Sequence, residues 1–104
     1  MNTTLAASKI IREIKEKRNE YDILHPSNGR RWYIATGQNM NEFNAQYPQK
    51  STYEFHYLIE SKSILDEVLT NVLQEDGLTP AEIDKFLTGK ATPVYLFNYC
   101  FNFK

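Results

Sequence analysis

Apolar and polar residues alternate along this chain with two different periods. Between residues 4 and 18, Ala7, Ile10, Ile11 and Ile14 recur three or four positions apart, which is the spacing of one helix face. The pattern predicts an N-terminal helix over residues 4–18. Because its apolar stripe is narrow, this helix is expected on the domain surface or docked on a partner.

The next two stretches predict a β-hairpin. Tyr21 and Ile23 alternate with polar residues, which is typical of a short strand. Asn28 and Gly29 follow in a turn, since both residue types tolerate a positive φ. Residues 31–36 are rich in aromatic and β-branched side chains and predict the second strand.

The middle of the chain has the clearest patterns. Every second residue between 52 and 60 is aromatic or aliphatic, which predicts a strand with one buried face: Tyr53, Phe55, Tyr57 and Ile59. Residues 63–74 carry a wide helical stripe: Ile64, Leu65, Val68, Leu69, Val72 and Leu73. Gly77 is placed to end that helix in a left-handed turn.

Two further helices are expected. Thr79 as N-cap, Pro80 as first residue and Glu82 as the reciprocal capping acid predict a helix that continues to Leu87 and stops at Gly89. A shorter helix is expected over residues 39–47, before a proline.

The last stretch, residues 93–103, alternates again and places five aromatic side chains on one side: Tyr95, Phe97, Tyr99, Phe101 and Phe103. We expect this side to face the core, since an uncovered aromatic strand promotes aggregation. The elements together predict an α+β fold: a small antiparallel sheet packed by helices, with an added N-terminal helix. The hairpin and residues 52–60 supply three strands, and residues 93–103 supply a fourth if they join the sheet.

The composition indicates one domain over residues 1–104. The apolar fraction is 41% and the charged fraction 24%, both ordinary for a globular chain. No apolar run approaches the roughly 20 residues of a membrane span, and no signal peptide is visible. The lone cysteine, Cys100, cannot form an internal disulfide. We therefore expect a cytoplasmic protein with no membrane partner and a buried, inert thiol.

The net charge of −1 is unevenly distributed. Residues 1–31 have seven basic and four acidic side chains, a balance of +3, whereas residues 32–104 have five basic and nine acidic ones, a balance of −4. The first segment permits contact with an anion such as nucleic acid, and the second permits contact with a basic protein.

Several common sites are not indicated by the sequence. Residues 88–90 lack the upstream glycine of a phosphate-binding loop. One cysteine and two separated histidines do not have the spacing of a metal site. His56 lies on the polar side of its strand, and His25 precedes a proline, so both are interpreted as solvated side chains.

One constellation is more specific. Tyr21-Asp22-Ile23, then Asn28-Gly29-Arg30, then Tyr33-Ile34-Ala35 resemble the opening hairpin of the GIY-YIG nuclease family. In that family two tyrosine-bearing strands are joined by a turn that often contains Asn-Gly. The resemblance continues through the expected helix, strand and helix, and covers residues 19–75. The N-terminal helix (4–18) and the segment 79–104 lie outside it.

The resemblance implies a site for phosphodiester cleavage. Tyr21 and Tyr33 match the tyrosines of the family, one of which activates the attacking water. Glu67 matches the glutamate that holds one divalent cation, such as Mg²⁺. Arg30 occupies a turn position that is commonly basic, and Arg31 follows it, so both are candidate nucleic-acid-binding residues.

The sequence also departs from the family pattern. Asn19-Glu20 replaces Gly-Ile, and Ala35 replaces the glycine of Tyr-Ile-Gly. The helix over residues 39–47 contains no arginine; Glu42 or Phe43 stands where the family places the one that stabilises the scissile phosphate. A glutamate there would repel the phosphate, which predicts a catalytically impaired domain.

Three functional hypotheses follow. The first is a catalytically impaired GIY-YIG-like domain, of viral or mobile-element origin, that binds nucleic acid or a host protein. The second is an active divalent-metal-dependent endonuclease in which Arg30 or Arg31 supplies the missing cation. The third is a protein-interaction or inhibitor module unrelated to nucleases. In each case the C-terminal aromatic strand is a candidate homodimer seam.

Overall fold

The computed structural model describes residues 4–26, 30–39, 41–42, 45 and 53–101. Helices and strands follow one another in the order α1 (Thr4–Leu24), β1 (Trp32–Gly37), β2 (Tyr53–Ile59), α3 (Lys62–Glu75), α4 (Pro80–Leu87) and β3 (Val94–Cys100). Asn41, Glu42 and Ala45 are also helical, where the short helix was expected. The remainder of that expected helix lies outside the described residues.

The three strands form one antiparallel sheet in the order β1-β3-β2. The small antiparallel α+β fold is therefore confirmed. The last strand was expected only as a candidate fourth member, yet β3 occupies the centre and pairs with both neighbours. Both edges of β3 are paired within the chain, so a second copy cannot add a strand to β3. A homodimer through the aromatic face of this strand stays a prediction.

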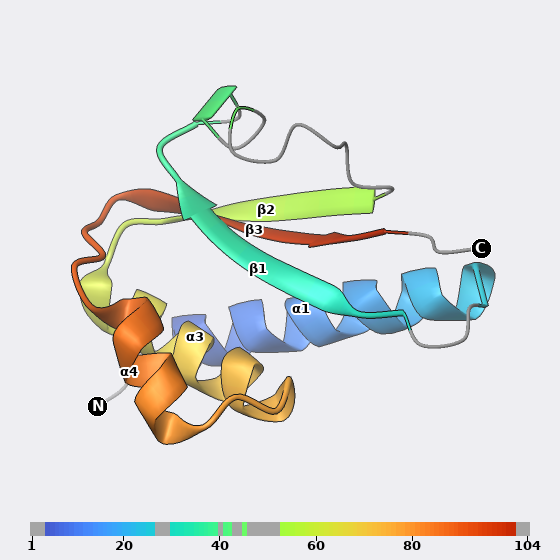
Figure 1. Ribbon diagram of the computed structural model, residues 1–104, viewed down its shortest axis with the longest axis horizontal. Helices are drawn as coiled ribbons and strands as arrows, with labels where there is room; N and C mark the ends of the chain where they lie inside the picture. Colours follow the sequence, from blue (N-terminus) through green and yellow to red (C-terminus); the bar gives the residue numbers. More distant parts are fainter. Residues whose placement is uncertain (1–3, 27–29, 40, 43–44, 46–52, 102–104) are drawn as a thin grey trace.

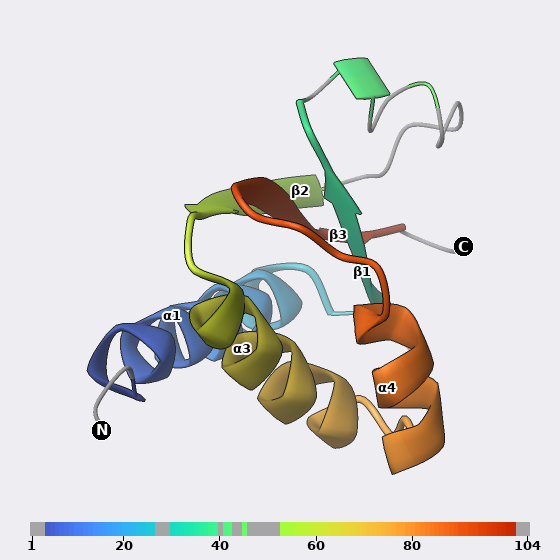
Figure 2. The ribbon, with the colours of Figure 1, turned by 90° about the vertical axis from the view of Figure 1, so that its left-hand side faces the viewer.

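All three labelled helices cover the same face of the sheet (Figure 1), as the view from the side also shows (Figure 2). Apolar side chains of α1, α3, α4 and the inner sheet face meet there in one cluster. Burial of such side chains is the main favourable term in folding. Fully buried members of the cluster are Ala7, Ile14, Leu65, Val68, Leu69 and Leu96.

The α1 helix is longer than its apolar stripe predicts, and this overturns the expected hairpin. Residues 19–24 continue the helix instead of forming a strand. Arg18 and Tyr21 lie three positions apart on one helix face, where they contact the sheet side chains Trp32 and Tyr53. The helix ends shortly before Pro26, because a proline disfavours helical backbone at the residue before it.

The turn between α3 and α4 follows local signals closely. Gly77 has φ +97°, and the amides of Gly77 and Leu78 donate to the carbonyls of Gln74 and Leu73, the pattern of a Schellman motif. Thr79 and Glu82 then form the predicted capping box at the start of α4. These bonds lower the pKa of Glu82.

The aromatic side of β3 points away from the helices, contrary to expectation. Val94, Leu96 and Asn98 face the main core, while Phe97 and Tyr99 belong to a second cluster on the other face of the sheet. The polar side chain of Asn98 can lie on the side of the main core because its Oδ1 accepts a hydrogen bond from Arg18 there. Phe97 and Tyr99 are 0% and 5% exposed, so the expectation that this strand is covered holds.

Two side chains that were expected in the interior, Cys100 and Tyr57, have raised pKa values. Cys100 is buried, and burial raises the pKa of its thiol, as expected for an inert cysteine. The Tyr57 hydroxyl donates to Glu13 Oε1 at 3.2 Å, and burial together with this bond raises the pKa of Tyr57. No helix in the described ranges is long and apolar enough to cross a membrane.

Candidate functional site

Tyr21 lies in an aromatic stack at the end of α1. Its ring stacks on those of His25 and Tyr53, with centroid distances of 4.3 and 4.4 Å. The Arg30 guanidinium lies 4.9 Å from the Tyr21 ring centroid. This packing, on the helix side of the sheet, fixes the end of α1 against β2.

Arg30 is held inside the same cluster. Its Nη1 donates to Asp22 Oδ1 at 2.9 Å, and only 4% of its side chain is exposed. The Trp32 indole N–H lies 3.3 Å from the Asp22 carboxylate oxygens. A paired, buried guanidinium of this kind is a structural link and is not presented to a phosphate.

Tyr33 lies on the opposite face of the sheet. It follows Trp32 in β1, and successive strand residues point to opposite faces. Its ring stacks on Tyr99 at 5.4 Å, in the second cluster. The sheet therefore separates Tyr33 from Tyr21.

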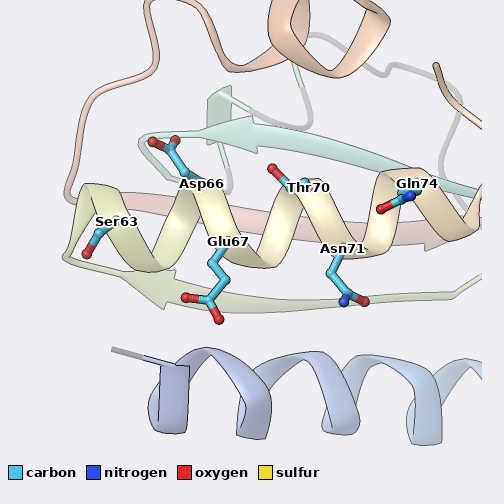
Figure 3. A pocket seen from close by; sticks show the side chains of 6 residues that line it. All are labelled: Ser63, Asp66, Glu67, Thr70, Asn71 and Gln74. Carbon is cyan, nitrogen blue, oxygen red and sulfur yellow. The ribbon is translucent and has the colours of Figure 1, made fainter. Parts of the chain in front are cut away.

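Glu67 lies in a third place, on the outer surface of α3. It lines an open depression of about 460 Å³ together with the other polar residues of that surface: Ser63, Asp66, Thr70, Asn71 and Gln74. Figure 3 shows that Glu67 and Asn71 point to one side of the helix, whereas Asp66 and Thr70 point to the other. The nearest carboxylate in the sequence, Asp66, is paired with Lys62.

The five residues that the resemblance brings together thus lie in three separate places: Tyr21 with Arg30, Tyr33 with Arg31, and Glu67 on α3. Neither Tyr21 nor Tyr33 lines the depression of Glu67, so a cation held by Glu67 would not lie beside either tyrosine. Within the described ranges no three histidine, cysteine or acidic side chains gather closely enough to hold a metal ion. These residues do not fit the single-metal nuclease site that the resemblance implies.

A partly buried polar network joins the helices to the sheet. Arg18 in α1 donates from Nη1 to Asp76 Oδ1 at 2.8 Å and from Nη2 to Asn98 Oδ1 at 2.9 Å. Asn98 is completely buried, and its Nδ2 has no partner among the described atoms. The network connects α1, the end of α3 and the central strand.

A cavity lies beside this network, and Asp76 also lines it. It has a volume of about 160 Å³, and residues 31–34 of the β1 region form one wall. Leu73, Asp76, Leu78 and Phe86 form the opposite wall. Because successive strand side chains alternate between faces, a cavity that touches four consecutive residues runs along the outer edge of β1.

One cation, Arg31, lines this cavity, and a second, Lys90, contacts the ring of a lining residue. Arg31 is exposed, with its guanidinium carbon 5.9 Å from the Tyr33 ring centroid. Lys90 Nζ lies 4.9 Å from the centroid of Phe86, which lines the cavity. Neither cation has a carboxylate partner among the described residues, whereas Asp76 is neutralised by Arg18.

The sequence patterns point to only part of this site. Arg31 and Tyr33, candidates on other grounds, both line the cavity. Leu78 and Phe86 carry no distinguishing signal of their own, since they look like ordinary apolar residues of a turn and a helix. The Schellman signal at Gly77 could have placed Leu78 near the end of α3, but nothing local places it opposite β1.

Comparison of the chain with protein-family models, with curated proteins and with solved structures found no match.

Proposed function

We propose that this chain is a protein-interaction module that binds an extended segment of a partner protein along the outer edge of β1. The observation that carries the proposal is the cavity beside that edge. Among the strands that the structure describes, β1 has one neighbour, β3, so its other side is an edge. An edge strand presents backbone N–H and C=O groups that can pair with an added strand.

The electrostatics favour a protein partner over nucleic acid. Of the two candidate arginines, Arg30 is paired with Asp22 and buried, which leaves Arg31 exposed at the cavity. The whole chain has a net charge of −1. Nucleic-acid binding draws most of its affinity from many cation–phosphate contacts, and a single exposed arginine at this edge supplies few.

The edge itself favours a foreign segment over a second copy. Residues 32–37 contain no carboxylate, so a second β1 paired along this edge would bring none to Arg31 and Lys90. A partner with acidic side chains would satisfy both cations.

The test is selection followed by amide exchange. The full chain is used to select binders from a random-peptide display library, and the ¹⁵N-labelled chain with a selected peptide is then followed by NMR. We expect slower hydrogen exchange at alternate amides of residues 32–37. The amides of residues 53–59, in the other outer strand, serve as the internal control and should not change.

Several outcomes would overturn the proposal. One is a failure to select any peptide, and another is protection of β2 or of the helices in place of β1. Concentration-dependent self-association with protection of β1 would assign the edge to a second copy. Salt-dependent binding of DNA or RNA that is lost in Arg31→Glu would assign it to nucleic acid.

A further inference from the structure

We infer that the β1 edge selects an acidic segment that carries one apolar anchor of leucine or phenylalanine size. This inference rests on the proposed function and adds the chemistry of the partner. It follows from the size of the cavity, the face on which the cavity opens and the position of the two cations.

The cavity has room for one apolar side chain. Its volume is about 160 Å³, and apolar protein cavities of about 150 Å³ bind a molecule the size of benzene. Leu73, Leu78 and Phe86 line it with apolar surface. The one carboxylate of its wall, Asp76, is already paired with Arg18 at 2.8 Å, so an apolar anchor would not leave that charge without a partner.

The position of the cavity determines where the anchor sits on the added strand. The apolar wall belongs to α3, α4 and the turn between them, which cover the helix side of the sheet. An anchor directly opposite Trp32 or Ile34, which pack on the main core, would therefore point to the helix side. Its immediate neighbours would point to the other face, because side chains alternate along a strand.

The two cations lie where those alternating positions need them. Arg31 lies over Tyr33, whose ring belongs to the face away from the helices, and so faces the residues directly next to the anchor. Lys90 lies over the ring of Phe86, a cavity-lining residue on the helix side, and is thus the cation nearest in the fold to the next position on the anchor's side. Acidic residues at one and two positions from the anchor would each meet a cation without a carboxylate partner among the described residues.

The test uses a panel of blocked nine-residue peptides. The parent has β-branched residues, a central leucine and a pair of glutamates on each side of the centre; one variant replaces the leucine by alanine, and another replaces the glutamates by lysines. Binding to the full chain is measured by titration calorimetry. We expect the alanine peptide to bind about tenfold more weakly, from lost apolar burial, and the lysine peptide to bind more weakly still.

Protein variants complete the design. Arg31→Glu should weaken the acidic peptide about threefold to tenfold and improve the lysine peptide, whereas Arg12→Glu, an equal charge change at an exposed position of α1, should do neither. Leu78→Ala should remove the preference for leucine over alanine. Leu87→Ala, at a partly buried leucine that does not line the cavity, should retain it.

The results separate the two claims. If selected peptides protect the amides of β1 but ignore the leucine and glutamate substitutions, the inference is wrong and the proposed function stands. If a selected peptide of unrelated composition binds the β1 edge while the whole panel fails, the conclusion is the same. If no peptide of either kind protects β1, both are wrong.

Discussion

Two adjacent regions share Asp76 and use charge in opposite ways. On its inner side, Asp76 belongs to a partly buried network in which Arg18 is bound by both a carboxylate and an amide oxygen. On its outer side, the same residue lines a cavity whose nearby cations, Arg31 and Lys90, have no carboxylate partner among the described residues.

The difference separates structural charge from charge available for binding. A buried cation is tolerated only when the chain itself supplies its partners, and Arg18 and Arg30 both meet this condition. A basic side chain at the surface can remain without one at little cost. Basic residues close together in the sequence, such as Arg30 and Arg31, can therefore have different roles.

The largest expected effect is on the inner side. Arg18→Met should lower the free energy of unfolding by about 2 kcal/mol, because the buried Asn98 and the partly exposed Asp76 both lose a hydrogen bond from a charged donor. Urea denaturation followed by circular dichroism measures this loss. The matched control is Arg12→Met, an exposed arginine of the same helix, which should change stability by no more than about 0.5 kcal/mol. An equal loss in both variants would contradict a special role for the network.

A second change tests whether the network acts as a unit. Asn98→Leu, added to Arg18→Met, should recover about 1–2 kcal/mol, since a buried amide without a partner costs about that much. The four proteins form a double-mutant cycle whose coupling energy is measured by denaturation. A coupling energy near zero would mean that Arg18 and Asn98 act independently.

A smaller effect on stability is expected at the start of α4, next to the cavity wall. Thr79→Ala removes the side chain that accepts from the Glu82 amide at 3.2 Å, and should destabilise the chain by about 1 kcal/mol. The control is Thr70→Ala, at an exposed position of α3. Thermal unfolding of both variants measures the difference. A Thr79→Ala protein as stable as the control would show that α4 needs no cap when it is packed in the fold.

The smallest effect on stability is expected at the outer side. Arg31→Glu should change the free energy of unfolding by no more than about 0.5 kcal/mol, because Arg31 is exposed and makes no ion pair with a described residue. Denaturation measures the change. A loss of 2 kcal/mol or more would place Arg31 with the structural charges and erase the contrast between the two sides.

The parts of the fold that were predicted correctly have local causes. The α3–α4 turn depends on a glycine with positive φ at Gly77 and on a threonine three residues before Glu82. Both signals act over a few residues, so they can be recognised in the sequence alone. The alternation of residues 53–59 is local in the same sense, since it reports which face of the strand is buried.

The parts that were predicted wrongly depend on distant contacts. Tyr21 fits a strand by its local pattern, and only its packing on Tyr53 together with the bonds of Arg18 to Asp76 and Asn98 explains why the helix continues past residue 18. Tertiary contacts of this kind override weak local preferences. The alternation of apolar and polar residues identifies a strand but does not say which strands it pairs with. The central place of β3 could therefore not be derived from the sequence.

The candidate site was only partly predicted for the same reason. Arg31 and Tyr33 were singled out for nuclease chemistry, and the structure places them at a cavity beside a sheet edge. The opposite wall comes from residues about 40 to 55 positions further along the chain. No pattern in either segment indicates that the two meet.

The central position of β3 also determines when this protein can fold during its synthesis. β1 and β2 make no ladder with each other and are joined only through β3, which follows both in the chain. When synthesis has reached residue 90, the three helices α1, α3 and α4 and both outer strands have been made, but the strand that joins β1 to β2 has not. Until residues 94–100 are made, β1 and β2 lack the strand with which both pair, and unpaired strand edges of this kind are where partly folded chains aggregate.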